Sequence, residues 1–137
     1  IQISKGKKIK PVSIETAIYP GFPTDVQAQW MTLMSLAKGS STIVDAVYHD
    51  RFTHIAELSR LGAKISLKYN VAQIKGVKRL HGTNVMSTDI RASASLIIAG
   101  LAAEGETEVS RVYHIDRGYE AIEHKVRALG GAIERVS

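Results

Sequence analysis

The sequence predicts an α/β (α+β) fold built from repeated units, and three observations lead to this prediction. The chain repeats itself at a spacing of about 64 to 68 residues. Each copy shows helical and strand patterns in the same order. A length of 137 residues with 45% hydrophobic content suffices for one packed core but not for two well-sized domains. We therefore expect residues 1–137 to form part of one domain, with repeat units at about 1–75 and 76–137.

Short segments of the first copy return in the same order in the second copy. The matches pair Thr24-Asp25 with Thr88-Asp89, Ala37-Lys38-Gly39 with Ala103-Glu104-Gly105, Val47-Tyr48-His49 with Val112-Tyr113-His114, Asp50-Arg51 with Asp116-Arg117, and Leu61-Gly62 with Leu129-Gly130. Because an internal repeat dictates architecture, these matches predict two related structural units.

The first helix of each copy begins at a threonine. Thr24 and Gln27 form the pattern of a capping box, and an apolar stripe then continues until Gly39. Thr88 is the predicted N-cap of the second of these helices, which runs to about Ala102 and is apolar on nearly every side. A helix without a polar face is expected to be buried all round.

A strand and a second helix follow the first helix in each copy. Stretches rich in β-branched residues predict strands at residues 42–48 and 107–113, and further strands are expected at residues 64–69, 72–74, 78–80 and 132–136 to complete the units. Asp50 and Asp116 are the predicted N-caps of the second helices, which end at Gly62 and Gly130. Residues 1–3 have the pattern of a strand interior, so we expect a longer parent chain.

The composition excludes several kinds of site. The chain has no cysteine, which rules out a disulfide framework, a thiolate zinc site and a cysteine nucleophile within this sequence. The histidines show no metal-ligand spacing and no phosphate-binding glycine motif is present, so we expect neither a metal nor a cofactor. No secretory signal is present, and the longest apolar stretch is too short to span a bilayer. We expect no membrane partner and a cytoplasmic location.

The charge favours an anionic partner. The net charge is +5 and the pI is about 9.6, with a cluster formed by Lys5, Lys7, Lys8 and Lys10. This cluster is typical of a solvated face, because the interleaved aromatic residues and recognition motif of a nucleic-acid surface are missing. The arginines stand singly near turns, which fits a small anion better than nucleic acid. A non-catalytic basic module that binds anions or nucleic acid remains an alternative of a different class.

Five charged residues near helix starts are candidate site residues. Asp25 and Asp89 lie in the first turn of the two first helices, where the helix N-terminus stabilises a carboxylate. This is also the ordinary place for a helix-starting acid, so a purely structural role stays open. Arg51, Arg91 and Arg117 lie at or just inside predicted helix N-termini, which disfavour cations unless an anion is held there. The arginines therefore indicate a site for an anionic substrate.

Two histidines occupy equivalent positions in the two copies. His49 and His114 both stand at the end of a predicted strand. Either they meet a shared structural need or one of them faces a cleft, and the pattern favours the structural role.

Four longer strings resemble a known family. They are PVSIET at residues 11–16, YPGFPTDVQAQ at 19–29, STDIRASA at 87–94 and HIDRGYE at 114–120. These strings resemble the enolpyruvyl transferases, and within that family the enzymes that use UDP-N-acetylglucosamine. The resemblance extends over essentially the whole chain. The resemblance implies transfer of enolpyruvyl from phosphoenolpyruvate to the 3′-hydroxyl of the sugar. This reaction is the first committed step of peptidoglycan synthesis in the bacterial cytoplasm and serves cell-wall biogenesis, cell shape and cell division.

The resemblance also implies the architecture of the whole enzyme. Members of the family have two domains of three repeated units each, arranged as an inside-out barrel with buried helices and outer sheets. This chain would supply two of the three units of one domain, and the rest of the same enzyme would be its partner. Because the substrates bind in the cleft between the domains, the isolated chain is expected to have no transferase activity. The shikimate-pathway enolpyruvyl transferase shares the fold and the type of reaction, and it remains the nearest alternative.

The same resemblance assigns roles to the candidate residues. Asp25 resembles the base that takes the 3′-hydroxyl proton and contacts the UDP-sugar, and Val47 resembles a backbone contact to that sugar nucleotide. Arg91 and Arg117 resemble the arginines that bind phosphoenolpyruvate. Asp89 resembles the acidic residue that lies beside these arginines. The expected catalytic residues are Asp25, Asp89 and Arg117. The expected phosphoenolpyruvate-binding residues are Arg51, which would also serve cleft closure, Arg91 and Arg117.

Overall fold

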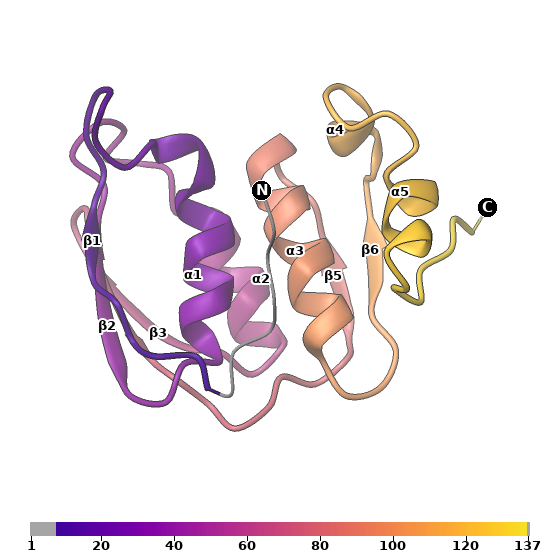
Figure 1. Cartoon of the computed structure of the whole chain (residues 1–137), viewed down its shortest axis with the longest axis horizontal. Helices are drawn as coiled ribbons and strands as arrows, with labels where there is room; N and C mark the ends of the chain where they lie inside the picture. Colours follow the sequence, from indigo (N-terminus) through magenta and orange to yellow (C-terminus); the bar gives the residue numbers. More distant parts are fainter. Residues whose placement is uncertain (1–7, 137) are drawn as a thin grey trace.

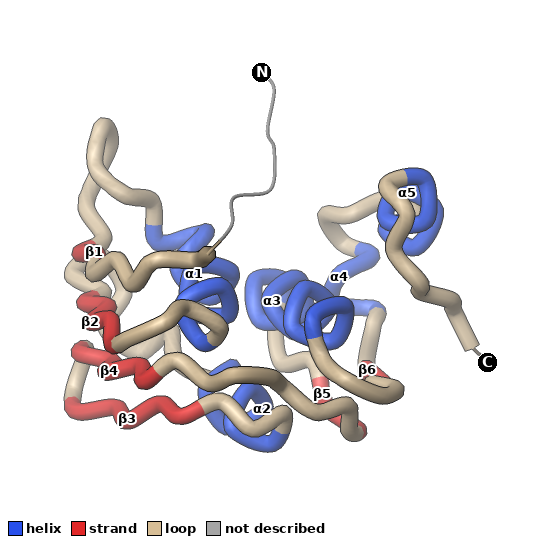
Figure 2. Tube along the Cα trace, turned by 60° about the horizontal axis from the view of Figure 1, so that its bottom comes forward, coloured by secondary structure: helices blue, strands red, loops and turns tan. Residues whose placement is uncertain are grey.

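The computed structural model describes residues 8–136, which combine helices with a larger and a smaller sheet (Figures 1 and 2). The larger sheet contains, in spatial order, β1 (Ile14–Glu15), β2 (Ser40–Val44), β4 (Val71–Lys75) and β3 (Lys64–Lys68). β1 is parallel to β2, whereas β2 with β4 and β4 with β3 are antiparallel. The smaller sheet pairs β5 (Asn84–Met86) in parallel with β6 (Glu108–Ser110). This mixture confirms the predicted α+β class.

The central helices lie between the two sheets, as Figure 1 shows. They are the short 3₁₀ helix η1 (Thr24–Val26), α1 (Gln27–Ser35), α2 (His54–Arg60) and α3 (Ile90–Ala102). The chain then continues through α4 (Tyr113–Asp116) and α5 (Ile122–Ala128), which lie on the right-hand side of Figure 1. The core between helices and sheets includes the fully buried side chains of Met31, Met34, Ile43, Leu58, Ile74 and Leu96. Each side chain of this size stabilises the fold by about 1.5–3 kcal/mol when buried.

Two of the predicted strands in the larger sheet are confirmed, and one is shorter than expected. The strands expected at residues 64–69 and 72–74 are β3 and β4, which pair antiparallel along their whole length. The strand expected at residues 42–48 ends at Val44. The reason is Asp45, whose carboxylate accepts hydrogen bonds from the amides of Val47 and Tyr48 and so folds these residues into a turn.

The division into repeat units at about 1–75 and 76–137 stays a prediction.

Other strand predictions are wrong. Residues 78–80 and 132–136 form no strand, and the strand expected at residues 107–113 ends at Ser110, before α4. β1 and β5 were not predicted, because two or three residues are too few for an alternating pattern and both strands exist through parallel pairing with distant partners. The strand interior expected at residues 1–3 lies outside the described residues.

Thr24 does not form the predicted capping box with Gln27. The N-cap of η1 is the preceding residue and makes no side-chain capping bond. The Thr24 hydroxyl instead donates to Oδ2 of Asp45 at 2.6 Å, and the Gln27 amide donates to the carbonyl oxygen of Arg51 at 3.2 Å. Partners that are distant in sequence thus take both side chains away from the backbone of their own helix.

The predicted N-caps of the other helices are also wrong. α3 is capped by Asp89 rather than Thr88, because Oδ1 of Asp89 accepts from the next two free amides of the helix. α2 begins only at His54, so Asp50 lies in the loop before it. Asp116 is the last residue of α4, and α5 starts after Ala121, which has a positive φ of 45°.

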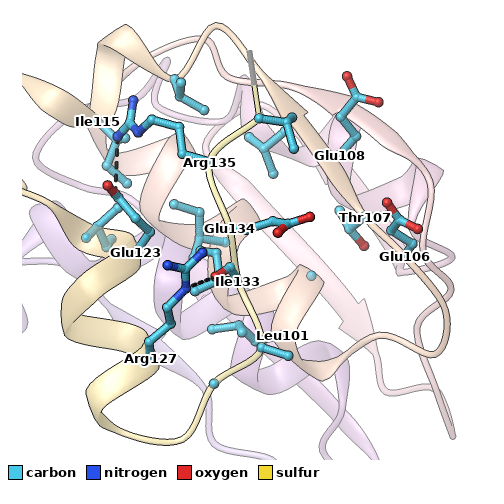
Figure 3. Close-up of a pocket in the computed structure, with 18 of the residues that line it drawn as sticks. Leu101, Glu106, Thr107, Glu108, Ile115, Glu123, Arg127, Ile133, Glu134 and Arg135 are labelled. Carbon is cyan, nitrogen blue, oxygen red and sulfur yellow. Dashed lines mark hydrogen bonds and ion pairs between the residues drawn. The ribbon is translucent and has the colours of Figure 1, made fainter.

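α3 is buried on most of its surface but not all round. The side chains of Ile98 and Leu101 are 42% and 43% exposed. Leu101 lies at the edge of a cavity of about 700 Å³ between α3, β6 and residues 131–136, which is lined by both apolar and charged side chains (Figure 3). The expectation of complete burial is therefore wrong along this side of the helix. Of the helices that the structure describes, none has the length and apolar character needed to cross a membrane.

Candidate functional site

Asp25 lies between two arginines from distant parts of the chain. Its Oδ1 accepts hydrogen bonds from Nη1 of Arg51 at 2.8 Å and from Nε of Arg91 at 2.6 Å. Arg91 is in the first turn of α3, and 66 positions separate it from Asp25. Figure 1 shows the N-terminal ends of α1 and α3 at the same end of the molecule, which explains this approach. The structure thus brings three predicted site residues together in one ion-pair cluster.

The ion pairs lower the basicity of Asp25. The hydrogen bond from Arg91 is the largest influence and holds the pKa of Asp25 below its usual range, against an opposing effect of burial. Arg51 acts in the same direction as Arg91. Because 64% of the Asp25 side chain is exposed, solvent screens these pairs. With both arginines in place, Asp25 is an ionised and weak base.

A cavity of about 390 Å³ lies next to this cluster. The residues that line it are Thr88, Asp89, Ile90, Arg91, His114 and Arg117. They come from the start of α3, from α4 and from the residue after α4, which lie at the same end of the molecule in Figure 1. Arg91 belongs both to the cavity and to the ion-pair cluster. Two arginines in one cavity suit a small anion with several negatively charged oxygens.

Asp89 serves the helix as well as the cavity. Its Oδ1 accepts from the amides of Arg91 and Ala92 at 2.8 and 3.0 Å, and the Thr53 hydroxyl donates to its Oδ2 at 3.3 Å. Burial raises the pKa of Asp89, but these hydrogen bonds outweigh burial and hold its pKa below the usual value. Asp89 thus occupies two amides of the first turn of α3, and the two guanidinium groups are the charged donors among the residues that line this cavity.

Asp45 is a buried acid that the sequence analysis did not single out. It follows β2 directly, is fully buried, and accepts hydrogen bonds from two threonine hydroxyls and two backbone amides. One of these amides belongs to Val47, which is 44% exposed in the turn that Asp45 organises. The available signal was an ionisable residue inside a stretch otherwise predicted to be a strand.

His114 lines the cavity that also contains Arg91 and Arg117. The sequence favoured a structural role, and the structure places His114 in the lining of the cavity beside Arg117, with its ring 4.3 Å from that of Tyr113. Its equivalence to His49 in the repeat was the signal that marked it. In the described part of the chain, no group of three His, Asp or Glu side chains is arranged to hold a metal ion.

Comparison with known sequences gives a consistent result over nearly the whole chain. Residues 1–126 match the family described as EPSP synthase (3-phosphoshikimate 1-carboxyvinyltransferase). The UDP-N-acetylglucosamine 1-carboxyvinyltransferases of Chlorobium phaeovibrioides and Geotalea daltonii are 59% and 55% identical to this chain, over 98% and 99% of its residues. The matched regions are 32% and 33% of those two proteins, so the chain spans about a third of the length of these curated relatives.

Solved structures show the same relationship. The enolpyruvyl transferase NikO from Streptomyces tendae matches with a TM-score of 0.85 and 32% identity, over 95% of this chain and 30% of that one. An EPSP synthase from Acinetobacter baumannii shares the fold, with a TM-score of 0.66 and 20% identity over 83% of this chain and 27% of that one. These findings confirm the resemblance seen in the sequence. The chain belongs to the family of EPSP synthase (3-phosphoshikimate 1-carboxyvinyltransferase), and it is similar to the UDP-N-acetylglucosamine 1-carboxyvinyltransferases within the enolpyruvyl transferases.

Proposed function

We propose that this chain is part of a transferase that moves enolpyruvyl from phosphoenolpyruvate to the 3′-hydroxyl of UDP-N-acetylglucosamine. In this proposal the enzyme works in the bacterial cytoplasm, at the first committed step of peptidoglycan synthesis. The observation that carries the proposal is the Asp25 cluster, in which a carboxylate lies against Arg91 at the edge of a cavity that also contains Arg117. A base beside an anion-binding pair of arginines is what this transfer requires. The names of the curated relatives support the choice of sugar substrate.

The arginines are proposed to bind phosphoenolpyruvate. Arg91 and Arg117 line one cavity, and a guanidinium group binds a carboxylate or phosphate through two parallel hydrogen bonds. Arg51 is proposed to contribute to binding of the same anion, because it shares Asp25 with Arg91. Asp89 keeps the first turn of α3, and therefore Arg91, in place.

Asp25 is proposed to take the proton of the 3′-hydroxyl as the sugar oxygen bonds to the enolpyruvyl carbon and phosphate leaves. Without substrate, Arg51 and Arg91 are both paired with Asp25. An anion in the cavity competes for Arg91, which removes the largest influence that lowers the pKa of Asp25. Substrate binding would thus make Asp25 a better base. Val47 is proposed to contact the sugar nucleotide through its carbonyl oxygen, because its amide is already bonded to Asp45.

The proposed function is tested in the complete protein that contains these residues. Phosphate release is measured with phosphoenolpyruvate and either UDP-N-acetylglucosamine or shikimate 3-phosphate. We expect activity with the sugar nucleotide alone. Activity only with shikimate 3-phosphate would favour the second candidate, which the description of the matched family suggests. Inactivity with both acceptors would contradict the proposal.

A second measurement tests the arginines. Arg91→Lys and Arg117→Lys keep the charge but lose the paired hydrogen bonds, so kcat/KM for phosphoenolpyruvate should fall by at least about tenfold. The matched control is Arg79→Lys, which changes an exposed arginine that pairs with Glu104 away from the cavity. Unchanged kinetics in Arg117→Lys would remove Arg117 from the site.

A further inference from the structure

The Asp45 carboxylate is saturated with hydrogen-bond donors at the end of β2. Its Oδ1 accepts from the Thr16 hydroxyl at 2.6 Å and from the amides of Tyr48 and Val47 at 2.8 and 3.1 Å. Its Oδ2 accepts from the hydroxyl of Thr24 at 2.6 Å. Burial raises the pKa of Asp45, but these hydrogen bonds outweigh burial and hold its pKa below the usual value. Asp45 is therefore a buried carboxylate that is kept ionised.

The ionised carboxylate fixes the direction of the hydrogen bond at Thr24. A carboxylate can only accept, so the Thr24 hydroxyl must donate its proton to Asp45 and keeps its lone pairs for another donor. That donor is Nη1 of Arg51, which lies 3.1 Å from the Thr24 oxygen and 2.8 Å from Oδ1 of Asp25. The result is a chain of hydrogen bonds from the Asp45 carboxylate through the Thr24 hydroxyl and the Arg51 guanidinium to the Asp25 carboxylate. Donation to an anion also makes the hydroxyl oxygen a stronger acceptor.

A second contact of Arg51 also leads back to Asp45. The Arg51 guanidinium lies over the ring of Tyr48, 4.7 Å from its centre, and the Tyr48 amide is one of the four groups bonded to Asp45. The Arg51 side chain is only 17% exposed, whereas that of Asp25 is 64% exposed. Arg51 is thus the anchored partner in this pair, and Asp25 is positioned against it.

We propose that Asp45 is a positioning residue for the transfer reaction, acting through the Thr24 hydroxyl and the turn that carries Tyr48 to hold Arg51 against Asp25. This inference rests on the proposed function for its effect on turnover. The competing explanation is that Asp45 only fastens the loop after β2 to the helix start. That explanation predicts a loss of stability without a specific effect on kcat.

The experiment compares four variants of the complete protein. Asp45→Asn has the same shape but turns an amide donor towards Thr24, and Thr24→Val removes the hydroxyl without changing the volume much. Both should lower kcat about tenfold, the effect of losing one hydrogen bond to a charged group, with a smaller change in KM for phosphoenolpyruvate. Thr24→Ser keeps the hydroxyl and should restore kcat. The matched control is Thr32→Val, which removes a buried hydroxyl bonded to the carbonyl oxygens of Ala28 and Ser95, and should lower the melting temperature only.

Crystal structures of Asp45→Asn and Thr24→Val give a readout that does not depend on activity. We expect Arg51 to leave hydrogen-bonding distance of Asp25 in both variants and to remain there in Thr32→Val. The proposal is overturned if kcat stays within about twofold of wild type in both variants, or if Thr24→Ser fails to restore it. If the wild-type protein is inactive, the proposed function fails, and the crystal structures then decide: an unmoved Arg51 overturns the positioning role and a displaced Arg51 supports it.

Discussion

His54 is a buried titratable side chain outside the candidate site. It is 1% exposed, stacks on Phe52 with ring centres 6.4 Å apart, and its Nε2 has no hydrogen-bond partner among the described residues. Burial lowers the pKa of His54 to about 4, although the nearby charge of Asp89 acts in the opposite direction. His54 is therefore neutral at pH 7, as an imidazole in the core must be to avoid an unpaired charge.

We expect the chain to lose stability in mild acid because of His54. Its folded pKa of about 4 is below the ordinary value of 6.5, so the unfolded chain takes up the proton first as the pH falls. The free energy of unfolding should decrease between pH 6.5 and 4, by about 3 kcal/mol in total. The lowered pKa values of Asp45 and Asp89 affect stability below their ordinary value of 3.8, and that of Glu123 below 4.5, so the upper part of this pH window reports on His54. Urea unfolding at several pH values measures the slope.

His54→Gln removes the titrating group and should flatten this pH dependence, whatever it does to stability at neutral pH. The control is His124→Gln, which replaces a histidine whose side chain is 71% exposed. A wild-type protein whose stability is constant across the window would show that His54 is not buried in the neutral form.

Asp25 is expected to matter for turnover and little for stability. It is not a helix cap in the structure, because no side chain caps η1 and the carboxylate faces Arg51 and Arg91 instead. Asp25→Asn keeps the shape but cannot accept a proton, so turnover of the complete protein should fall about 10²-fold or more. Binding of UDP-N-acetylglucosamine should weaken much less, which calorimetry can measure. Asp50→Asn is the surface control and should have a normal turnover rate. A normal turnover rate in Asp25→Asn would mean that another residue is the base.

At the scale of elements, the end of α1 and the residues after β4 meet with no space for a side chain. The amide of Gly76 donates to the carbonyl oxygen of Gly39, and the amide of Val77 donates to that of Ser35, both at 2.8 Å. A Cβ atom at Gly76 would lie 1.7 Å from the carbonyl oxygen of Ala37. Because the obstacle is backbone, only a shift of the helix or of the strand could relieve the contact. This contact fixes how α1 lies on the larger sheet, and so where the helix start that carries Asp25 is placed.

Gly76→Ala is therefore expected to lower the free energy of unfolding by about 2–3 kcal/mol, as overpacking in a rigid place does. Denaturant unfolding measures the change. Gly130→Ala is the matched control, because its Cβ would meet nothing within 4 Å and only the positive φ of 88° opposes it, at about 1 kcal/mol. Equal losses in the two variants would mean that the α1 contact is loose.

At the scale of the molecule, apolar surface remains exposed around the C-terminal segment. Leu129 and Val136 are 89% and 67% exposed, and the cavity of about 700 Å³ in Figure 3 has apolar residues of α3, β6 and α5 next to charged ones in its lining. Exposed apolar surface of this kind favours association. We expect the isolated chain to self-associate at micromolar concentration. Sedimentation velocity measures this, and a sharply melting monomer would contradict it.

The isolated chain is also expected to have no transferase activity. It spans about a third of the length of its curated relatives, and the side chain of the proposed base Asp25 is 64% exposed. Water then competes for the charges that must hold the substrate. Phosphate release from a preparation proven free of longer protein would contradict this expectation.

The sequence by itself determined the elements with a strong local pattern and the family. The apolar periodicity located α1 and α3, the stretch rich in β-branched residues located β2, and the strings around Asp25 and Arg91 were long enough to identify the enolpyruvyl transferases. Periodicity and motifs are properties of neighbouring residues, so they can be read before the chain folds. The candidate charges Asp25 and Arg91 were found in the same way. Arg51 was singled out as a cation at a helix start, which is wrong because α2 begins only at His54, but the structure does bring Arg51 to Asp25.

Only the tertiary structure decided which partner each polar side chain takes. The Thr24 hydroxyl could cap its own helix or donate to Asp45, and in the structure it donates to Asp45. The reason is that a buried charge without hydrogen bonds costs more free energy than uncapped amides at a helix start, which water can solvate. The strand β5 exists because it pairs with β6, and Asp25 meets Arg91 across 66 positions. Such contacts depend on how helices and sheets pack, which local patterns do not contain. For this reason the charged residues of the candidate site could be predicted from the sequence, whereas the hydrogen bonds that position them could be found only from the fold.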